Sequence, residues 1–185
     1  MSNAHAKPTK SNLILDGKML KVSIDDLVLP NNQACQFEIV RHPGAAVIVP
    51  VDAQGHVTLV RQYRYVCDTW LLEVPAGKLD PGEAPETCAK RELLEETGLV
   101  AGKLTSLGSI YPTPGFCDEK LWLYLARDLI QESQNLDADE ILEVKTYTLE
   151  HALELALNGD IQDAKTVCAL LRAAHCLKVQ TQPKS

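Results

Sequence analysis

Residues 77–99, GKLDPGEAPETCAKRELLEETGL, are the most informative stretch of the chain. They predict a helix from about Ala84 to Thr97, because Gly98 follows at the point where a glycine ends a helix well. Glycine adopts the left-handed backbone conformation of a helix C-terminus without a steric penalty. This helix and the residues just before it are the basis of the functional interpretation.

Three glutamates lie on one face of the predicted helix. Glu92, Glu95 and Glu96 have the spacing i, i+3 and i+4, which places their carboxylates side by side. Like charges this close repel one another, so we expect a positive charge over that face. Hard oxygen ligands without cysteine or histidine favour magnesium or manganese over zinc. The simpler alternative is a solvated acidic surface, which most neighbouring glutamates form.

The spacing of the whole stretch resembles the Nudix box. Gly77 is followed after five residues by Glu83, and after seven more by Arg-Glu-Leu-x-Glu-Glu-x-Gly-Leu, which starts at Arg91. The match covers every defined position of the box. The resemblance implies an α/β fold, the Nudix α/β/α sandwich with a mixed sheet, in which the box forms a loop, a helix and a loop. It also implies a metal-dependent enzyme that cleaves the pyrophosphate bond of a nucleoside diphosphate attached to a small group.

The resemblance assigns roles to residues in and beside the box. Glu92 and Glu96 correspond to the main metal ligands, and the main-chain carbonyl of Ala76 completes the set. Magnesium is the expected ion, with manganese as the alternative. Such cations would also explain how a chain with a net charge of −7 holds an anionic substrate. Glu83 and Arg91 match positions that brace the loop.

The catalytic base is expected among acidic residues near the metal site. The resemblance implies a base from an acidic loop after the sheet, and residues 135–143 read NLDADEILE here. Glu140 is the first candidate for ligand or base and Glu143 is the second. Glu95, beside the metal ligands, is a further catalytic candidate. A base must lie within hydrogen-bond reach of the attacking water, and a solvated acidic loop is the alternative.

The regions that flank the box resemble the ADP-ribose and ADP-sugar pyrophosphatase branch of the family. The stretches that carry this resemblance are residues 61–64 (RQYR), 70–77 (WLLEVPAG), 111–116 (YPTPGF) and 163–166 (DAKT). The resemblance extends from about Lys21 to Leu177. It implies that ADP-ribose is hydrolysed to AMP and ribose 5-phosphate, or that a related nucleoside diphosphate sugar is cleaved.

Five residues in these flanks are candidates for contacts with the substrate. Arg64 and Glu73 would contact the ribose or the diphosphate, and Arg61 is a further candidate. A guanidinium grips a phosphate with two hydrogen bonds. The alternative is that both arginines are exposed charges on a strand. Pro114 and Gly115 belong to a loop that lies beside the substrate in this branch.

One departure leaves the choice of substrate open. Phe37 precedes Glu38-Ile39-Val40, where relatives often have an arginine. The ring either stacks on a base or packs at an interface, and the missing arginine admits other nucleotide sugars, including GDP-mannose. Hydrolysis of mutagenic triphosphates or capped RNA is a second alternative. A non-catalytic sensor of nucleotide sugars is an alternative from another class, although such proteins often lack the glutamates present here.

The composition excludes several classes of protein. A net charge of −7 argues against a nucleic-acid-binding surface. No apolar run is long enough to cross a bilayer and no signal segment begins the chain, so we expect no membrane partner and a cytoplasmic location. The six cysteines include no Cys-x-x-Cys pair. Reduced thiols are therefore expected, rather than a disulfide framework or a zinc site.

Alternating and β-branched residues predict strands on both sides of the box. The predicted strands are residues 21–27, 34–40, 45–51, 56–63, 70–74, 106–111, 121–126 and 142–147. The third and fourth of these are expected to form a hairpin through a turn at residues 52–55. Two further helices are predicted, one that follows Thr148 and ends before Asn158, and one that begins at Asp163.

The expected organisation has four parts. Residues 1–10 and 180–185 are predicted to be disordered tails, residues 11–43 a small antiparallel β segment, and residues 44–179 the Nudix domain. In relatives the strand-rich N-terminal segment packs across a two-fold axis. The resemblance therefore implies a homodimer, with a nucleoside diphosphate sugar as the other partner.

Overall fold

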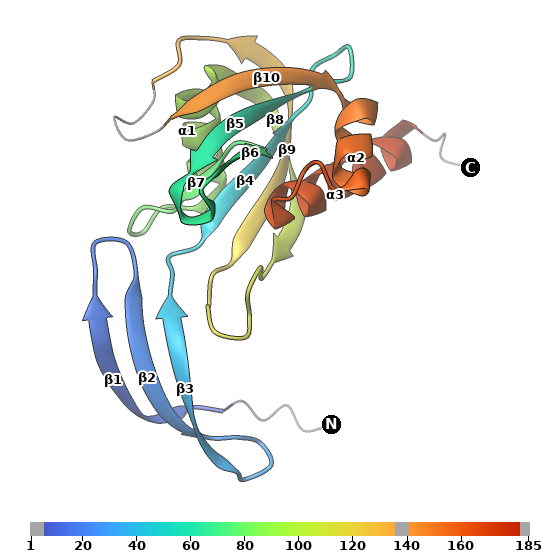
Figure 1. The fold of residues 1–185 in the computed structure, drawn as a ribbon. Helices are drawn as coiled ribbons and strands as arrows, with labels where there is room; N and C mark the ends of the chain where they lie inside the picture. The colour runs from blue at the N-terminus through green and yellow to red at the C-terminus, as the bar shows by residue number, and fades with distance from the viewer. Residues whose placement is uncertain (1–5, 136–140, 182–185) are drawn as a thin grey trace. The chain divides into compact units, whose positions relative to one another are not determined.

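The computed structural model describes residues 6–135 and 141–181, which form two compact units (Figure 1). The N-terminal unit comprises the chain up to Gly44 together with residues 111–120. The main unit comprises residues 45–110 and the chain from residue 121 onward. The sequence did not indicate that residues 111–120 group with the N-terminal strands.

The N-terminal unit contains an antiparallel sheet with the strand order β1-β2-β3. Its strands are β1 (Pro8–Asp16), β2 (Lys21–Val28) and β3 (Ala34–Arg41). β2 and β3 confirm two predicted strands and the predicted antiparallel segment. The expectation of a disordered tail through residue 10 was wrong for its last residues, because Pro8 and Lys10 pair with Leu27 and Asp26 of β2. The polar start of the chain did not reveal this strand, which pairs with the next strand across a short connection.

Residues 111–120 attach to the edge of β3. The Val40 amide donates to the Phe116 carbonyl at 2.8 Å, and the Asp118 amide donates to the Val40 carbonyl at 3.1 Å. The guanidinium of Arg41 lies 2.5 Å from the carboxylate of Asp25 in β2 and 3.2 Å from that of Asp118. Main-chain hydrogen bonds and ion pairs together hold this segment on the N-terminal unit.

The main unit contains two sheets. The first has the order β7-β4-β9-β8, from β4 (Ala45–Pro50), β7 (Ala76–Lys78), β8 (Leu99–Ile110) and β9 (Leu121–Gln131). β4 and β9 are parallel and the other pairs are antiparallel, so this sheet is mixed, as predicted. The second has the antiparallel order β10-β5-β6, from β5 (His56–Arg64), β6 (Thr69–Glu73) and β10 (Leu142–Thr148). The short 3-10 helix η1 (Tyr65–Cys67) connects β5 to β6.

The predicted hairpin of residues 45–51 and 56–63 is wrong. β4 and β5 belong to different sheets and share only an isolated bridge between Val51 and Val57. The turn itself is confirmed, because the Gly55 amide donates to the Asp52 carbonyl at 3.2 Å and Gly55 has a φ of 84°. β4 is apolar and buried at every position, which is the pattern of a strand covered on both faces inside a sheet.

Three helices of the described chain confirm the three that were predicted. They are α1 (Pro85–Thr97), α2 (Leu149–Asn158) and α3 (Ala164–Thr181). Gly98 ends α1 with a φ of 70° and donates its amide to the Leu94 carbonyl at 2.8 Å. Thr148 caps α2 by accepting the amide of His151. None of these helices is both long and apolar enough to cross a membrane.

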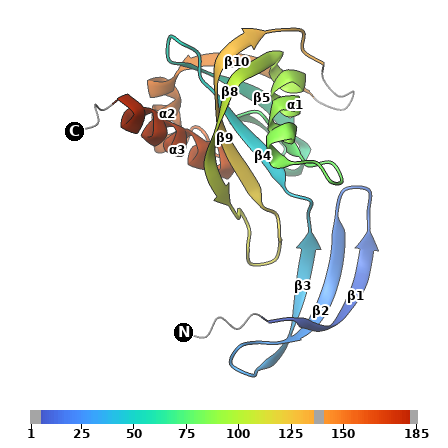
Figure 2. The ribbon, with the colours of Figure 1, turned by 180° about the vertical axis from the view of Figure 1, so that it is seen from behind.

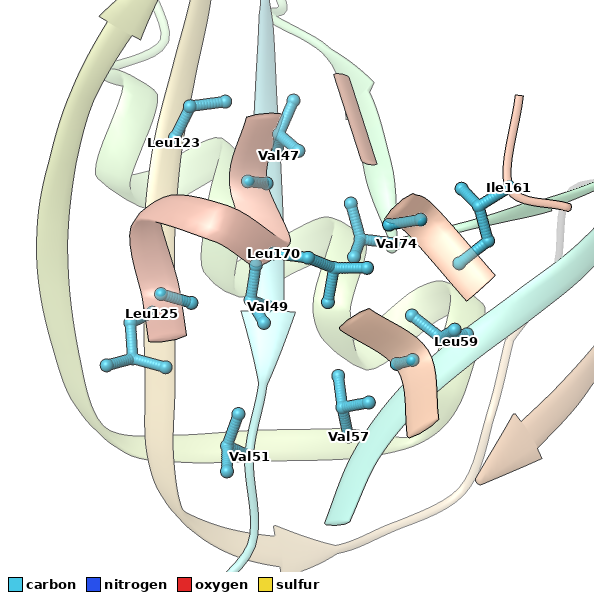
Figure 3. Packing of buried hydrophobic residues seen from close by; sticks show 14 of the residues in the cluster. Val47, Val49, Val51, Val57, Leu59, Val74, Leu123, Leu125, Ile161 and Leu170 are labelled. Atoms are coloured by element: carbon cyan, nitrogen blue, oxygen red, sulfur yellow. The ribbon is translucent and has the colours of Figure 1, made fainter. Parts of the chain in front are cut away.

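The side chains of β4 alternate between two apolar clusters. Val47 and Val49 point into the cluster shared with α3 and the second sheet (Figure 3). Ala46 and Ile48 point the other way, into the cluster that contains Leu93 of α1. Accordingly, α1 lies on one side of the β4 sheet, and α2 and α3 lie on the other (Figures 1 and 2). The predicted α/β class and its layering of helix, mixed sheet and helix are confirmed.

Candidate active site

Helix α1 buries two of its three neighbouring glutamates. Glu92 is 9% exposed and Glu96 is 2% exposed, whereas Glu95 is only partly buried. Ala89 and Leu93, both fully buried against β4, determine the rotation of the helix. Ionised carboxylates are costly to bury unless cations or hydrogen-bond donors meet them. The partners of these two carboxylates therefore indicate what the site can do.

Strand β7 brings its main chain against both carboxylates. The Ala76 amide donates to Oε2 of Glu96 at 3.1 Å. A Cβ atom at Gly77 would lie 1.8 Å from the carboxyl carbon of Glu92, so a side chain at this position would collide with that group. The close approach of Glu92, rather than an unusual backbone angle, is therefore the reason for a glycine at position 77.

Cys88 also contacts the main chain of β7, from the buried side of α1. Its thiol donates to the carbonyls of Gly77 and Lys78, each at 3.4 Å. Burial raises the pKa of Cys88 to about 12, so the thiol is protonated at neutral pH. All six cysteines lie in the described chain, and each is a free thiol. Cys88 is therefore a structural residue of the site.

Arg91 brings positive charge to the acidic face of α1. Its Nη1 donates to Glu92 at 2.7 Å and to Glu95 at 3.0 Å. Its Nε and Nη2 donate to Glu83 at 3.0 and 2.9 Å, and these hydrogen bonds lower the pKa of Glu83 to about 2. The geometry fits the bracing role that the box resemblance implies. It also shows that the protein itself supplies part of the positive charge expected over this face.

The donor atoms of this site suit a hard divalent cation. Within the described chain, no three carboxylate, imidazole or thiol groups converge as they would in a preformed metal site. Glu92 and Glu96 meet the main chain of β7, while Arg91 holds Glu95. Two buried carboxylates offer oxygen ligands, which fit magnesium or manganese better than zinc.

A second group of charges joins β5, β6 and the start of α3. Arg64 donates to both carboxylate oxygens of Glu73, from Nε and Nη2, each at 2.7 Å. Glu73 is 1% exposed and also binds Lys165, whose ammonium lies 3.0 Å from Asp163. Burial alone would raise the pKa of Glu73, but Arg64 and Lys165 outweigh it and hold that pKa below its usual value. We call these four residues the paired cluster.

Sequence reasoning identified only half of the paired cluster. Arg64 and Glu73 come from strands that are adjacent in sequence and paired in the sheet. Lys165 lies 92 positions from Glu73, and only the fold brings them together. The resemblance of residues 163–166 to the pyrophosphatase branch was the one signal that pointed to Lys165 and Asp163, and it assigned them no role.

Arg61 lies outside the paired cluster. Its guanidinium stacks over the ring of Trp70 at 4.4 Å and lies 3.7 Å from Glu143 of β10. Glu143 also contacts Lys145 at 2.9 Å, and this hydrogen bond lowers the pKa of Glu143. A carboxylate stabilised in this way binds a proton more weakly, which makes Glu143 a poorer general base.

The remaining predicted site residues lie elsewhere in the chain. Glu140 lies outside the described residues. Pro114 and Gly115 are exposed and belong to the N-terminal unit, within residues 111–120. Phe37, on β3 of the same unit, is 41% exposed. The functional roles of these residues stay predictions.

Comparisons relate the chain to known proteins over almost its whole length. The model of the NUDIX domain matches residues 40–170. The ADP-ribose pyrophosphatase of Bacillus subtilis is 41% identical over 184 residues, which cover 97% of this chain and 100% of that protein. The methanol dehydrogenase activator of Bacillus methanolicus is 39% identical over 166 residues, 89% of this chain and 90% of that protein. A crystal structure of an ADP compounds hydrolase matches with a TM-score of 0.84 at 28% identity, covering 99% of this chain and 100% of that one.

Proposed function

The chain belongs to the Nudix family of hydrolases, and on this premise we propose that it cleaves the pyrophosphate bond of ADP-ribose or of a related nucleoside diphosphate sugar. With ADP-ribose the products would be AMP and ribose 5-phosphate. Similarity over the whole chain to an ADP-ribose pyrophosphatase and to an ADP compounds hydrolase supports this substrate class. GDP-mannose is the alternative substrate, because Phe37 stands where relatives often have an arginine.

The observation that carries the proposal is the position of Glu92 and Glu96 against β7. The Glu92 carboxyl group occupies the space beside Gly77 where a side chain would otherwise lie, and Glu96 accepts the Ala76 amide. Two carboxylates are thus buried beside one peptide segment, where Arg91 contacts Glu92 and the charge of Glu96 acts on Arg64. Such a site attracts an added cation, which in turn attracts an anionic diphosphate.

Nudix hydrolases generally use divalent metal ions, and we propose Mg²⁺ for this chain, with Mn²⁺ as the alternative. Glu92, Glu96 and the carbonyl of Ala76 would hold the ion, and Glu95 would join them if Arg91 released it. When bound, the ion would neutralise phosphate oxygens and lower the pKa of a water molecule. Loss of activity on chelation and recovery with Mg²⁺ would test this assignment.

The reaction adds water across a P–O–P linkage. The water oxygen bonds to one phosphorus, the bridging oxygen leaves with the other phosphate, and a base must take the proton of the water. We propose Glu140 for this role, with Glu95 and Glu143 as the other candidates. Glu143 ranks below Glu140 because its ion pair with Lys145 reduces its affinity for a proton.

The substrate diphosphate is proposed to bind Arg64. A guanidinium has five N–H donors, and Glu73 uses two of them, which leaves others for phosphate oxygens. Glu73 itself is buried, so we propose that it contributes to binding by holding Arg64. Arg61 is proposed as a second, weaker contact, and Pro114 and Gly115 as contacts from the loop.

The N-terminal unit is proposed to form a homodimer. In its three strands and their connections, the large exposed apolar residues are Leu13, Ile14, Leu15, Met19, Val28 and Phe37. Neighbouring residues of a strand point to opposite faces, so the run from Leu13 to Leu15 exposes apolar surface on both faces of β1. A second copy related by a two-fold axis would cover such a surface. Light scattering during size-exclusion chromatography should give twice the chain mass, and a monomer would contradict the proposal.

We also propose that residues 11–43 act as the dimerisation segment and residues 44–179 as the hydrolase domain. A cytoplasmic location is proposed because all six cysteines are free thiols, the state that a reducing compartment maintains. Fractionation of the native host with an antibody against the chain would test this location.

A substrate panel tests the proposed activity. Purified protein with Mg²⁺ is incubated with ADP-ribose, ADP-glucose, GDP-mannose, NADH and diadenosine tetraphosphate, and the products are separated by anion-exchange chromatography. We expect the highest kcat/KM with ADP-ribose. Cleavage of diadenosine tetraphosphate alone would place the chain in another branch. Tight binding of ADP-ribose in calorimetry without turnover would instead indicate a sensor.

A further inference from the structure

The start of α3 is joined to the end of β6 by a continuous series of hydrogen bonds. Asp163 caps the helix and accepts the amide of Thr166 at 3.0 Å and its hydroxyl at 2.5 Å. The oxygen of the same hydroxyl accepts the Val74 amide at 2.9 Å. Thr166 is fully buried, so this connection lies inside the main unit. The first turn of α3 is therefore held in a defined position beside β6.

Lys165 occupies a position that does not favour a cation by itself. It is the second residue of α3, where the partial positive charge of the helix N-terminus repels an ammonium group. Its side chain is also only 15% exposed. The carboxylates of Glu73 and Asp163 offset both costs by contacting the ammonium directly. Lys165 is thus fixed between two carboxylates, one of which belongs to the substrate-binding strands.

Glu73 transmits this constraint to Arg64. Both oxygens of Glu73 accept hydrogen bonds from Arg64, and one of them also accepts from Lys165. The Arg64 side chain is 39% exposed and would sample several rotamers without a partner. A two-bond contact with a fixed carboxylate sets the plane of the guanidinium. Without Lys165, Glu73 would lose one of its two cations and gain freedom to rotate.

We propose that Lys165, held in place by Asp163, is a positioning residue that orients Arg64 through Glu73 and does not itself touch the substrate. This inference rests on the proposed function, because it takes Arg64 as the residue that binds the diphosphate. Its effect should appear mainly in KM, since a better oriented arginine improves binding of the substrate and of the transition state alike.

The first measurement compares the wild-type enzyme with Lys165→Met, which removes the charge but keeps an unbranched side chain. We expect KM for ADP-ribose to rise about tenfold with little change in kcat, the scale of one lost charge-assisted hydrogen bond. Lys165→Arg, which restores a cation, should recover part of the loss. The matched control is Lys103→Met on an exposed site of β8, which should leave both constants unchanged.

The decisive measurement repeats Lys165→Met in an Arg64→Met background. If Lys165 acts through Arg64, its replacement should change KM by less than about twofold when Arg64 is already absent. A similar rise in both backgrounds would overturn the proposal, because Lys165 would then bind the substrate directly or affect the fold in general. No change in the wild-type background would overturn it as well.

Folding and activity controls separate the remaining outcomes. Melting temperatures are measured for every variant, and Lys165→Gln replaces Lys165→Met if the latter does not fold. If neither variant folds, Lys165 is required for the fold and the positioning role is refuted. If the wild-type enzyme turns over no nucleoside diphosphate sugar, the proposed function and this inference both fall. If the enzyme is active but Lys165→Met and Arg64→Met have additive effects on KM, only the positioning role is refuted.

Discussion

Two charged regions of the main unit, the paired cluster and the acidic face of α1, differ in how their charges are balanced. In the paired cluster two carboxylates, Glu73 and Asp163, meet two cations, Arg64 and Lys165. Each charge is compensated by a neighbour inside the protein, which is the condition for keeping buried ions. We therefore expect the ion pairs of this cluster to be formed before a ligand binds.

The acidic face of α1 gathers its carboxylates around one arginine of the same helix. Glu83, Glu92 and Glu95 share the single guanidinium of Arg91, and Glu96 adds a fourth carboxylate on the same element as the last two. Neighbouring carboxylates repel one another, and the charge of Glu96 also helps to raise the pKa of Arg64 in the paired cluster. The ion pairs of the paired cluster are therefore present in the protein itself, whereas we propose that a bound cation completes the acidic face of α1.

The largest expected effect comes from Glu96→Gln, on the acidic face of α1. We expect kcat to fall by about two to three orders of magnitude, because an amide is a weak ligand for a divalent cation. The melting temperature should stay the same or rise, since one charge leaves a crowded acidic face. Glu86→Gln, on the exposed side of α1, is the matched control and should change neither quantity. A collapse of the melting temperature in Glu96→Gln would reveal a structural role.

Glu73→Gln removes a charge from the paired cluster, where we expect an effect on stability. At neutral pH the free energy of unfolding should fall by roughly 3 kcal/mol, because Arg64 and Lys165 would keep their charges without a carboxylate between them. In the folded protein the pKa of Glu73 is below its usual 4.5, so ionised Glu73 stabilises the fold above that pH. This stabilisation is lost as the pH falls through the lowered pKa.

Urea unfolding at a series of pH values measures this difference between wild type and Glu73→Gln. The two proteins should converge in stability as the pH falls below about 4.5, the usual pKa of a glutamate. A gap that stays constant over the acidic range would show that the charge of Glu73 is not what stabilises the paired cluster.

Gly77→Ala tests the close approach on which the acidic site depends. The added Cβ would lie 1.8 Å from the carboxyl carbon of Glu92, so we expect a loss of about 2 kcal/mol in unfolding free energy. The loss should largely disappear in a Glu92→Ala background, which removes the colliding group. Gly55→Ala, in open space but at a φ of 84°, is the control and should cost about 1 kcal/mol. Equal losses in both backgrounds would contradict the proposed collision.

The smallest effect is expected for Arg61→Met. Arg61 is partly exposed, stacks on Trp70 and has no buried carboxylate to hold it, so we expect KM to rise by only about threefold. Arg64→Met should raise KM at least as much as Lys165→Met does. Initial-rate measurements over a range of ADP-ribose concentrations would resolve the two arginines. If Arg61→Met and Arg64→Met raise KM equally, pairing with Glu73 does not make Arg64 the stronger substrate contact.

Local patterns predicted most elements of the fold, and the failures have one physical cause. α1 and α3 follow from helical spacing within a short window, and Gly98 marks the end of α1. The short strand β7 was not predicted. It is a strand only because a distant strand offers hydrogen bonds, as Val47 of β4 does for Ala76. The false hairpin has the same origin, since the partners of β4 are remote in sequence.

The sequence by itself determined which chemistry is available: the spacing of Glu92 and Glu96 on a helix, the glycine at position 77 and the family to which they belong. Only the tertiary structure decided how the charges are shared between elements, by placing Arg91 of α1 against Glu83 and Lys165 against Glu73. The reason is the separation along the chain between the residues that interact. Helical spacing is a local property of the chain, whereas an ion pair between residues 92 positions apart exists only after the sheets and helices have packed.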